Sequence, residues 1–333
     1  MSQVEIRQVA AGEEGMRLDR WFRSHYPDLG HGALQKLLRS GQVRVDGARA
    51  KSGTRLAAGQ NIRIPPLRTV EKGPKEKKPA RKPVSRRDSA LVREMILHMD
   101  DAVIALNKPS GLAVQGGSRT ARHLDGLLDA LVYDAAERPR LVHRLDRDTS
   151  GVLLLARTRQ AAARLSAAFR SRSARKIYWA LVSGVPRPQQ GRIDMALRKT
   201  GGAGRERMRA ADAGDEDALR AATYYAVIAK AGARLSWLSV KPVTGRTHQI
   251  RAHLAEIGHP IVGDPKYGPP GGHDIEGIEN RLHLHARRLT LPHPSGGILD
   301  VTAPLPEHMR RTWKFLGLSE KVDFDPLEEE GMQ

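Results

Sequence analysis

The chain has 333 residues, which is enough for a large core and more than one domain, and it carries a formal net charge of +19. It contains no cysteine, which excludes disulfides, thiolate nucleophiles and cysteine-ligated zinc. We find no long uncharged apolar run and no signal-peptide pattern near Met1, so we expect a cytoplasmic protein that does not enter the membrane. The charge predicts a polyanionic partner. A GC-rich genome would also favour arginine, but here the basic residues are clustered.

Residues 14–64 are predicted to form a small domain of two helices followed by short strands. Leucines and aromatic residues recur at helical spacing in the first half, and an Asp-Gly hairpin turn follows. Basic residues lie on the opposite helical face. This arrangement resembles an α/β S4-type RNA-binding domain, and the alternative is a surface domain whose arginines are merely solvated. The residues expected to bind RNA are Arg17, Arg20, Lys36 and Arg39.

Two segments have the composition of unfolded chain. Residues 65–93 are rich in proline, lysine and arginine, and we predict a mobile basic linker that holds phosphates nonspecifically. Residues 319–333 form an acidic tail that we expect to be disordered.

Residues 95–318 are predicted to form an α+β domain. Strands outnumber helices and follow one another without regular βαβ alternation, which favours a mixed, largely antiparallel sheet. The predicted strands are 102–109, 151–157, 176–184, 222–230, 233–242, 283–292 and 298–304, and the predicted helices are 159–169 and 245–258.

Residues 143–151, HRLDRDTSG, concentrate two carboxylates, two arginines and a histidine before a predicted strand. Ser150 lacks the G-x-S-x-G context of a hydrolase nucleophile. A glycosidase would need a fixed separation between Asp146 and Asp148, and here that separation depends on an unknown loop. The histidines within 248–259 lack the spacing of a helical zinc site. Nothing in the sequence calls for a metal, nucleotide or redox cofactor.

Several further motifs accompany this segment in a fixed order. They are LNKPSGLAVQGG (106–117), RKIYWALVSG (175–184), VKPVTGRTHQIRAHL (240–254), GDPKYG (263–268) and LHARRLTLPHP (284–294). Together they resemble the RluA family of RNA pseudouridine synthases over about 95–300, and an N-terminal S4 domain is common in that family. The motifs IPPLR, LNKPSG and LVHRLDRDTSGVLLLAR are most similar to the ribosomal large-subunit pseudouridine synthase C subgroup.

The resemblance implies a reaction that needs no cofactor. The N1–C1′ bond of a uridine breaks, the uracil turns, and the ring is rejoined through C5, so no atom and no electron is gained or lost. The resemblance assigns Asp146 as the catalytic carboxylate, which either adds to the base or sugar or stabilises positive charge at C1′. A single Asp in a loop is otherwise most often a cap or turn residue.

The resemblance also assigns partners to this carboxylate. Arg251 is the expected positive partner, because burial without one would raise the pKa of the carboxyl group. Tyr178 is expected to stack on the uracil and to take a proton from the reacting centre. Ile250 is expected to line the pocket.

Uracil inside folded RNA is stacked or paired, so the enzyme must extrude it. The resemblance implies that Arg144 fills the gap that the flipped base leaves. We expect Lys108 to form part of the pocket wall that meets the substrate, and residues such as Arg175 and Lys176 to contact phosphates.

The function expected from these motifs is pseudouridine formation in 23S large-subunit ribosomal RNA, in a protein that acts as a monomer. Three alternatives stay open. The first is the same chemistry at other ribosomal or transfer RNA uridines. The second is a noncatalytic RNA-binding or ribosome-assembly factor, which would have no reason to keep Asp146, Tyr178 and Arg251. The third is a nucleoside hydrolase, which the RNA-binding module disfavours.

Overall fold

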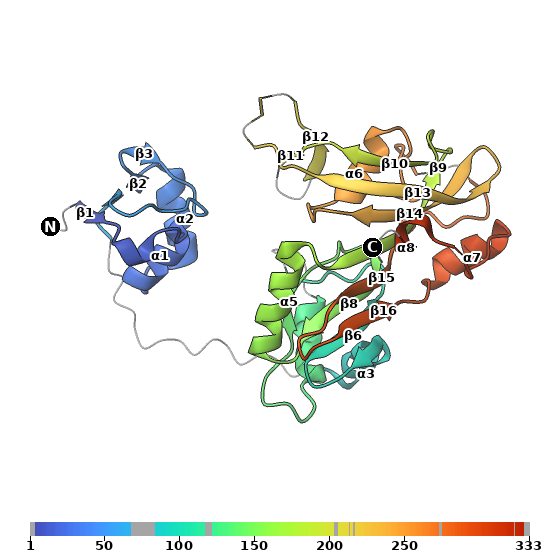
Figure 1. The fold of residues 1–333 in the computed structure, drawn as a ribbon, viewed down its shortest axis with the longest axis horizontal. Coiled ribbons are helices and arrows are strands. Elements are labelled where there is room, and N and C mark those ends of the chain that lie inside the picture. The colour runs from blue at the N-terminus through green and yellow to red at the C-terminus, as the bar shows by residue number, and fades with distance from the viewer. Residues whose placement is uncertain are drawn as a thin grey trace. The chain divides into compact units, whose positions relative to one another are not determined.

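The computed structural model divides into two units, Met1–Arg81 and Lys82–Gln333, which we describe separately (Figure 1). No described helix is long and apolar enough to cross a membrane. The described residues are 4–67, 84–116, 122–202, 206–212, 214–215, 217–272, 275–322 and 324–329.

The first unit packs two helices against a four-stranded sheet of order β1-β4-β2-β3. Its core joins the leucines and aromatic residues of the predicted helices to apolar residues of the sheet such as Val45, Ile62 and Ile64, with Trp21 and Phe22 in edge-to-face contact. Its elements are β1 (Glu5–Gln8), a 3-10 helix (Ala11–Glu13), α1 (Leu18–His25), α2 (His31–Arg39), β2 (Arg44–Val45), β3 (Ala48–Arg49) and β4 (Asn61–Ile64).

Strand β1 lies before the predicted start of this domain at residue 14, so that boundary is wrong. All four residues of β1 are exposed, which leaves no apolar alternation for a sequence pattern to detect. The strand forms because its backbone pairs antiparallel with β4 along its whole length.

The second unit is built on a 10-stranded sheet whose main path is β10-β13-β14-β9-β15-β8-β6-β5. Its strands are β5 (Ile96–Met99), β6 (Val103–Lys108), β7 (Arg140–Leu141), β8 (Ser150–Ala156), β9 (Arg175–Ser183), β10 (Gln190–Asp194), β13 (Ala222–Ala231), β14 (Leu235–Pro242), β15 (Leu284–Pro292) and β16 (Ile298–Thr302). A separate hairpin pairs β11 (Leu197–Thr200) with β12 (Arg207–Ala210). The helices are α3 (Arg86–Glu94), α4 (Leu124–Leu127), a 3-10 helix (Leu128–Leu131), α5 (Arg159–Ser171), α6 (Gln249–Glu256), α7 (Glu307–Phe315) and α8 (Pro326–Glu329).

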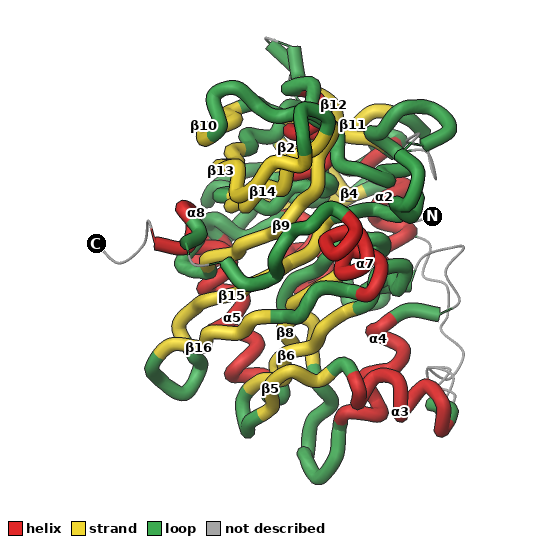
Figure 2. The backbone as a smooth tube through the Cα atoms, turned by 90° about the vertical axis from the view of Figure 1, so that its right-hand side faces the viewer, coloured by secondary structure: helices red, strands yellow, loops and turns green. Residues whose placement is uncertain are grey.

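The predicted mixed, largely antiparallel sheet is confirmed. Only β8 and β15 run parallel to each other among the described strand pairs, and each predicted strand and helix coincides with an observed one. Figure 2 shows β9, β15, β8, β6 and β5 side by side. Strand β8 is buried on both faces: Leu153 and Leu155 pack toward the α3 and α4 side, while Val152 and Leu154 pack toward α5.

Both segments predicted to be unfolded contain structure. Helix α3 overlaps the C-terminal end of the predicted linker 65–93, where the Ser85 side chain caps it and Val92 packs into the core. Residues 68–83 of that linker lie outside the described residues. In the predicted tail, α8 buries Leu327 against the core, so the prediction of disorder is wrong for the 324–329 segment. The composition of these segments did not predict either helix, because only a few buried contacts stabilise each of them.

The loop that carries HRLDRDTSG joins β7 to β8, and a single glycine sets where it ends. Gly151 has φ +108° on β8, where it pairs with Ala286 of β15. A Cβ atom at Gly151 would lie 2.2 Å from the Ala286 carbonyl oxygen. Only glycine permits this close approach, which brings the loop beside β9 and β15.

Candidate active site

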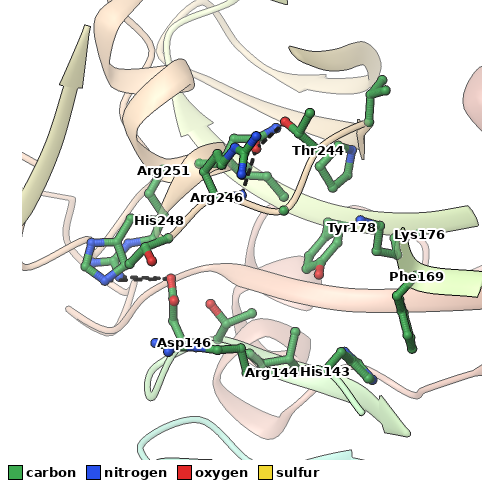
Figure 3. Close-up of a pocket in the computed structure, with 18 of the residues that line it drawn as sticks. His143, Arg144, Asp146, Phe169, Lys176, Tyr178, Thr244, Arg246, His248 and Arg251 are labelled. Atoms are coloured by element: carbon green, nitrogen blue, oxygen red, sulfur yellow. Dashed lines mark hydrogen bonds and ion pairs between the residues drawn. The ribbon is translucent and has the colours of Figure 1, made fainter. Parts of the chain in front are cut away.

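A cavity of about 530 Å³ opens where the β7–β8 loop, strand β9 and the N-terminal end of α6 meet (Figure 3). The residues brought together there come from segments far apart in the sequence. Those used below are His143, Arg144, Asp146, Phe169, Arg170, Arg172, Lys176, Tyr178, His248, Ile250 and Arg251.

Asp146 and Arg251 face each other at this cavity, as the sequence predicts. The distance from Arg251 Nη1 to Asp146 Oδ2 is 3.4 Å. The other edge of the Arg251 guanidinium donates to both oxygens of Asp264, with Nε–Oδ2 and Nη2–Oδ1 distances of 2.7 Å each. The Arg251 and Asp264 side chains are 2% and 0% exposed, whereas Asp146 is 19% exposed. The guanidinium is therefore fixed by Asp264 and presents its remaining nitrogen to the accessible carboxylate.

This chain of charges explains the direction of both pKa shifts. Burial alone would raise the pKa of Asp264, but Arg251 and the backbone N–H groups of Lys266 and Tyr267 hold it below its usual range. Burial alone would lower the pKa of Arg251, and Asp264 followed by Asp146 raise it instead. Sequence analysis gave Asp264 no role. The motif GDPKYG was the signal that could have pointed to Asp264, because a buried arginine guanidinium needs a second acceptor besides Asp146.

Tyr178 and Ile250 line the cavity from β9 and α6 respectively. Ile250 is 7% exposed and joins the core beneath α6. Burial raises the pKa of Tyr178 far above its usual range, and the negative charge of Asp146 adds to this rise. The phenol therefore keeps its proton in the free protein.

Arg144 is exposed at the cavity and makes no hydrogen bond or ion pair with any residue that the structure describes. Its guanidinium is therefore available to a ligand. Within the described ranges, no group of three or more histidine or carboxylate side chains could hold a metal ion.

Comparison with known proteins agrees with this geometry. The sequence model of the RNA pseudouridylate synthase family matches residues 102–256. Ribosomal large subunit pseudouridine synthase C of Escherichia coli strain K12 is 36% identical over 92% of this chain and 95% of the relative. The mitochondrial RNA pseudouridine synthase 4 of Arabidopsis thaliana is 34% identical over 89% of this chain and 78% of the relative. The chain belongs to the RluA family of RNA pseudouridine synthases.

Solved structures agree with the assignment of this synthase. The structure of Human RNA Pseudouridylate Synthase Domain Containing 4 matches with a TM-score of 0.60 at 29% identity, covering 70% of this chain and 98% of that one. The synthase is thus an isomerase that rearranges uridine.

The synthase also has a chain of polar contacts from Asp146 through His248 to Tyr267, which the sequence motifs did not predict and which we call the relay. His248 precedes α6 in a left-handed conformation (φ 51°), with Nε2 3.9 Å from Asp146 Oδ2. Its Nδ1 lies 3.1 Å from the Tyr267 hydroxyl, which accepts the Met208 backbone N–H at 2.8 Å. Because that hydroxyl already accepts one hydrogen bond, it is placed to donate its own hydrogen to Nδ1. The hydrogen of His248 is then left on Nε2, facing Asp146.

We expect His248 to be the neutral Nε2–H tautomer, observable by ¹⁵N-edited histidine NMR at pH 7. Burial lowers its pKa, which the charge of Asp146 only partly opposes. A Tyr267→Phe variant lacks the donor to Nδ1, so the His248 nitrogen shifts should move toward a mixture of tautomers. His253 on the same helix, bonded to Thr223 and to the Met195 carbonyl, is the internal control and should not move. An Nδ1–H tautomer in the wild type would contradict the relay.

Lys108 does not form the substrate-facing wall that was predicted. It is fully buried and lies outside the cavity lining, and its ammonium donates to the carbonyls of Pro109, Leu112 and Arg147 at 2.9–3.0 Å. Burial lowers its pKa to about 7, although the charges of Asp148 and Asp146 oppose this. A buried ammonium must satisfy its hydrogens within the protein. Lys108 therefore ties the β7–β8 loop to the 109–112 segment.

His143 fixes the other end of the loop. Its Nε2 accepts the Leu154 backbone N–H at 2.8 Å, and its ring stacks on Phe169 at 4.5 Å. Burial lowers its pKa to about 3, with a further contribution from the charge of Lys176. The ring is neutral and orients the loop.

The basic residues predicted on the first unit are all exposed. Arg17 forms an ion pair with Asp19 at 2.7 Å, and Arg39 donates weakly to the Gln35 carbonyl at 3.4 Å. Arg20 and Lys36 are exposed on α1 and α2. Their role in RNA binding stays a prediction.

Proposed function

We propose that this synthase converts specific uridines of 23S large-subunit ribosomal RNA to pseudouridine, with Asp146 as the catalytic residue. The observation that carries the proposal is the accessible Asp146 carboxylate held beside the fixed guanidinium of Arg251 in a cavity of about 530 Å³. The choice of ribosomal RNA rests on relatives named ribosomal large subunit pseudouridine synthase C, one of them 34% identical over 98% of its length, from Vibrio vulnificus.

The chemistry assigns a role to each group at the cavity. Asp146 either adds to the base or sugar or stabilises positive charge at C1′ while the N1–C1′ bond breaks. After C5 bonds to C1′, the proton on C5 must leave and N1 must gain one. Tyr178 enters as a neutral phenol because of its raised pKa, so it can accept the C5 proton only if its own proton leaves at the same time.

RNA binding is proposed to divide between base extrusion and backbone contact. Arg144, unpaired among the described residues, supports the role of filling the space left by the extruded uridine. An S4-type first unit with exposed Arg20 and Lys36 would contact the phosphate backbone, setting affinity and its salt dependence.

The test uses large-subunit ribosomal RNA from a strain that lacks this protein. The RNA is treated with the purified synthase, derivatised with carbodiimide, and mapped by primer extension. We expect new stops at one or a few uridines. The same treatment of transfer RNA serves as the comparison. Stops confined to transfer RNA would contradict the ribosomal substrate, and no stops in either RNA despite tight binding would favour a noncatalytic RNA-binding factor.

A further inference from the structure

Lys176 is a charged side chain on the cavity wall that the fold does not use. It lies on β9 two residues before Tyr178, so both side chains are on the same face of the strand. Figure 3 places it beside Tyr178 and Phe169, at the opposite end of the view from His248. It is half-buried and makes no hydrogen bond or ion pair with any described residue.

Among the residues that the structure describes, no acidic group offsets this charge. Burial lowers the pKa of Lys176, and none of the described carboxylates raises it again. The charge of Lys176 acts on His143, which is neutral. By contrast, the neighbouring Arg175 points to the other face and donates to the carbonyl of Leu327 in α8. Arg175, predicted as a phosphate contact, is thus committed to the fold, whereas Lys176 is not.

Two more unpaired cations line the same cavity. Arg170 and Arg172, at the end of α5, are exposed and have no hydrogen-bond or ion-pair partner within the described part of the chain. Positive side chains at a helix C-terminus complement the helix dipole, which accounts for these arginines by themselves. It does not account for Lys176, which lies on a strand and is partly desolvated.

An uncompensated, half-buried ammonium destabilises the free protein, and a bound anion would remove that penalty. We propose that Lys176, with Arg170 and Arg172, binds a backbone phosphodiester of the RNA next to the extruded uridine. This inference rests on the proposed function, because it assumes that RNA enters this cavity. RNA is favoured over a free anion because three separate cations line one continuous cavity beside Tyr178.

The test separates this role from a structural one by the sign of two effects. In a Lys176→Met variant the penalty disappears, so the melting temperature should rise by about 1–4 °C. Affinity for a large-subunit ribosomal RNA transcript should fall by about 3- to 10-fold at 0.1 M KCl, and the slope of log Kobs against log salt should decrease by about 0.7–0.9. Lys230→Met, which removes an exposed lysine from β13, is the matched control and should change neither quantity.

A second variant and a phosphate titration distinguish RNA binding by Lys176 from a structural role and from a free-anion site. Arg172→Met, at an exposed position where folding is not in question, should also reduce the salt slope. A lower melting temperature for Lys176→Met with unchanged RNA affinity would make Lys176 structural and overturn the inference. Stabilisation of the wild type by inorganic phosphate, lost in Lys176→Met while the RNA salt slope is unchanged, would indicate a free-anion site and also overturn it. Neither result touches the proposed function, which is judged separately by uridine mapping.

Discussion

An Asp146→Asn variant of the synthase is expected to lose pseudouridine formation by at least about 10³-fold while binding RNA within about threefold of the wild type. The amide has nearly the same shape as the carboxylate, but it can neither add to the base or sugar nor stabilise positive charge at C1′. Folding should be retained, because Arg251 keeps its two short hydrogen bonds to Asp264. Single-turnover assays on the mapped ribosomal RNA, together with filter binding of the same RNA, measure the two quantities.

The matched control for this variant is Asp148→Asn in the same loop. The Asp148 side chain pairs with Arg147 at 3.1 Å and does not line the cavity with Asp146, so its loss should change the rate by less than about tenfold. If Asp146→Asn retains a rate close to that of the wild type, Asp146 is not the catalytic residue.

The second large effect is on stability. Asp264→Asn should lower the free energy of unfolding by about 3–5 kcal/mol, because it leaves the buried Arg251 guanidinium without its main counter-charge. The displaced guanidinium should also reduce activity. Urea unfolding followed by circular dichroism measures this as a lower midpoint at unchanged slope. Asp194→Asn, which breaks the exposed pair with Arg192, is the control and should cost no more than about 1 kcal/mol.

The same pair predicts how stability depends on pH. The pKa of Asp264 is lower in the folded protein than in the unfolded chain, so its contribution is fully present above the unfolded value near 4. That contribution is lost as the pH falls through the lower folded value. Below pH 4 the wild type should therefore lose stability more steeply than Asp264→Asn, and parallel curves would contradict the assignment of a depressed pKa.

Local pattern in the sequence carried most of the catalytic unit. Strand β8 contains the apolar run VLLLA, β14 interleaves apolar residues with serines and a lysine, and α5 has a helical apolar stripe. The motif HRLDRDTSG and its companions identified Asp146, Tyr178 and Arg251, which the fold brings to one cavity. Segments with exposed residues or few apolar ones, such as β1 and α8, gave no such signal.

Contacts between distant segments lay beyond the reach of the sequence. A lysine within the motif LNKPSG predicts a cation that faces a ligand, yet the ammonium of Lys108 donates its hydrogen bonds to three backbone carbonyls. Asp264 and Tyr267 share the short motif GDPKYG, and nothing local says that one fixes Arg251 and the other His248.

The sequence by itself therefore determined the family, the strand-rich architecture and the reaction class, because apolar periodicity and motif order can be read along the chain, and it supplied the residues that we propose for the reaction. The tertiary structure alone decided which charges are satisfied inside the protein and which stay free for a ligand. The physical reason is that a buried ion is stabilised or destabilised by partners within a few ångströms, and folding draws those partners from distant parts of the chain.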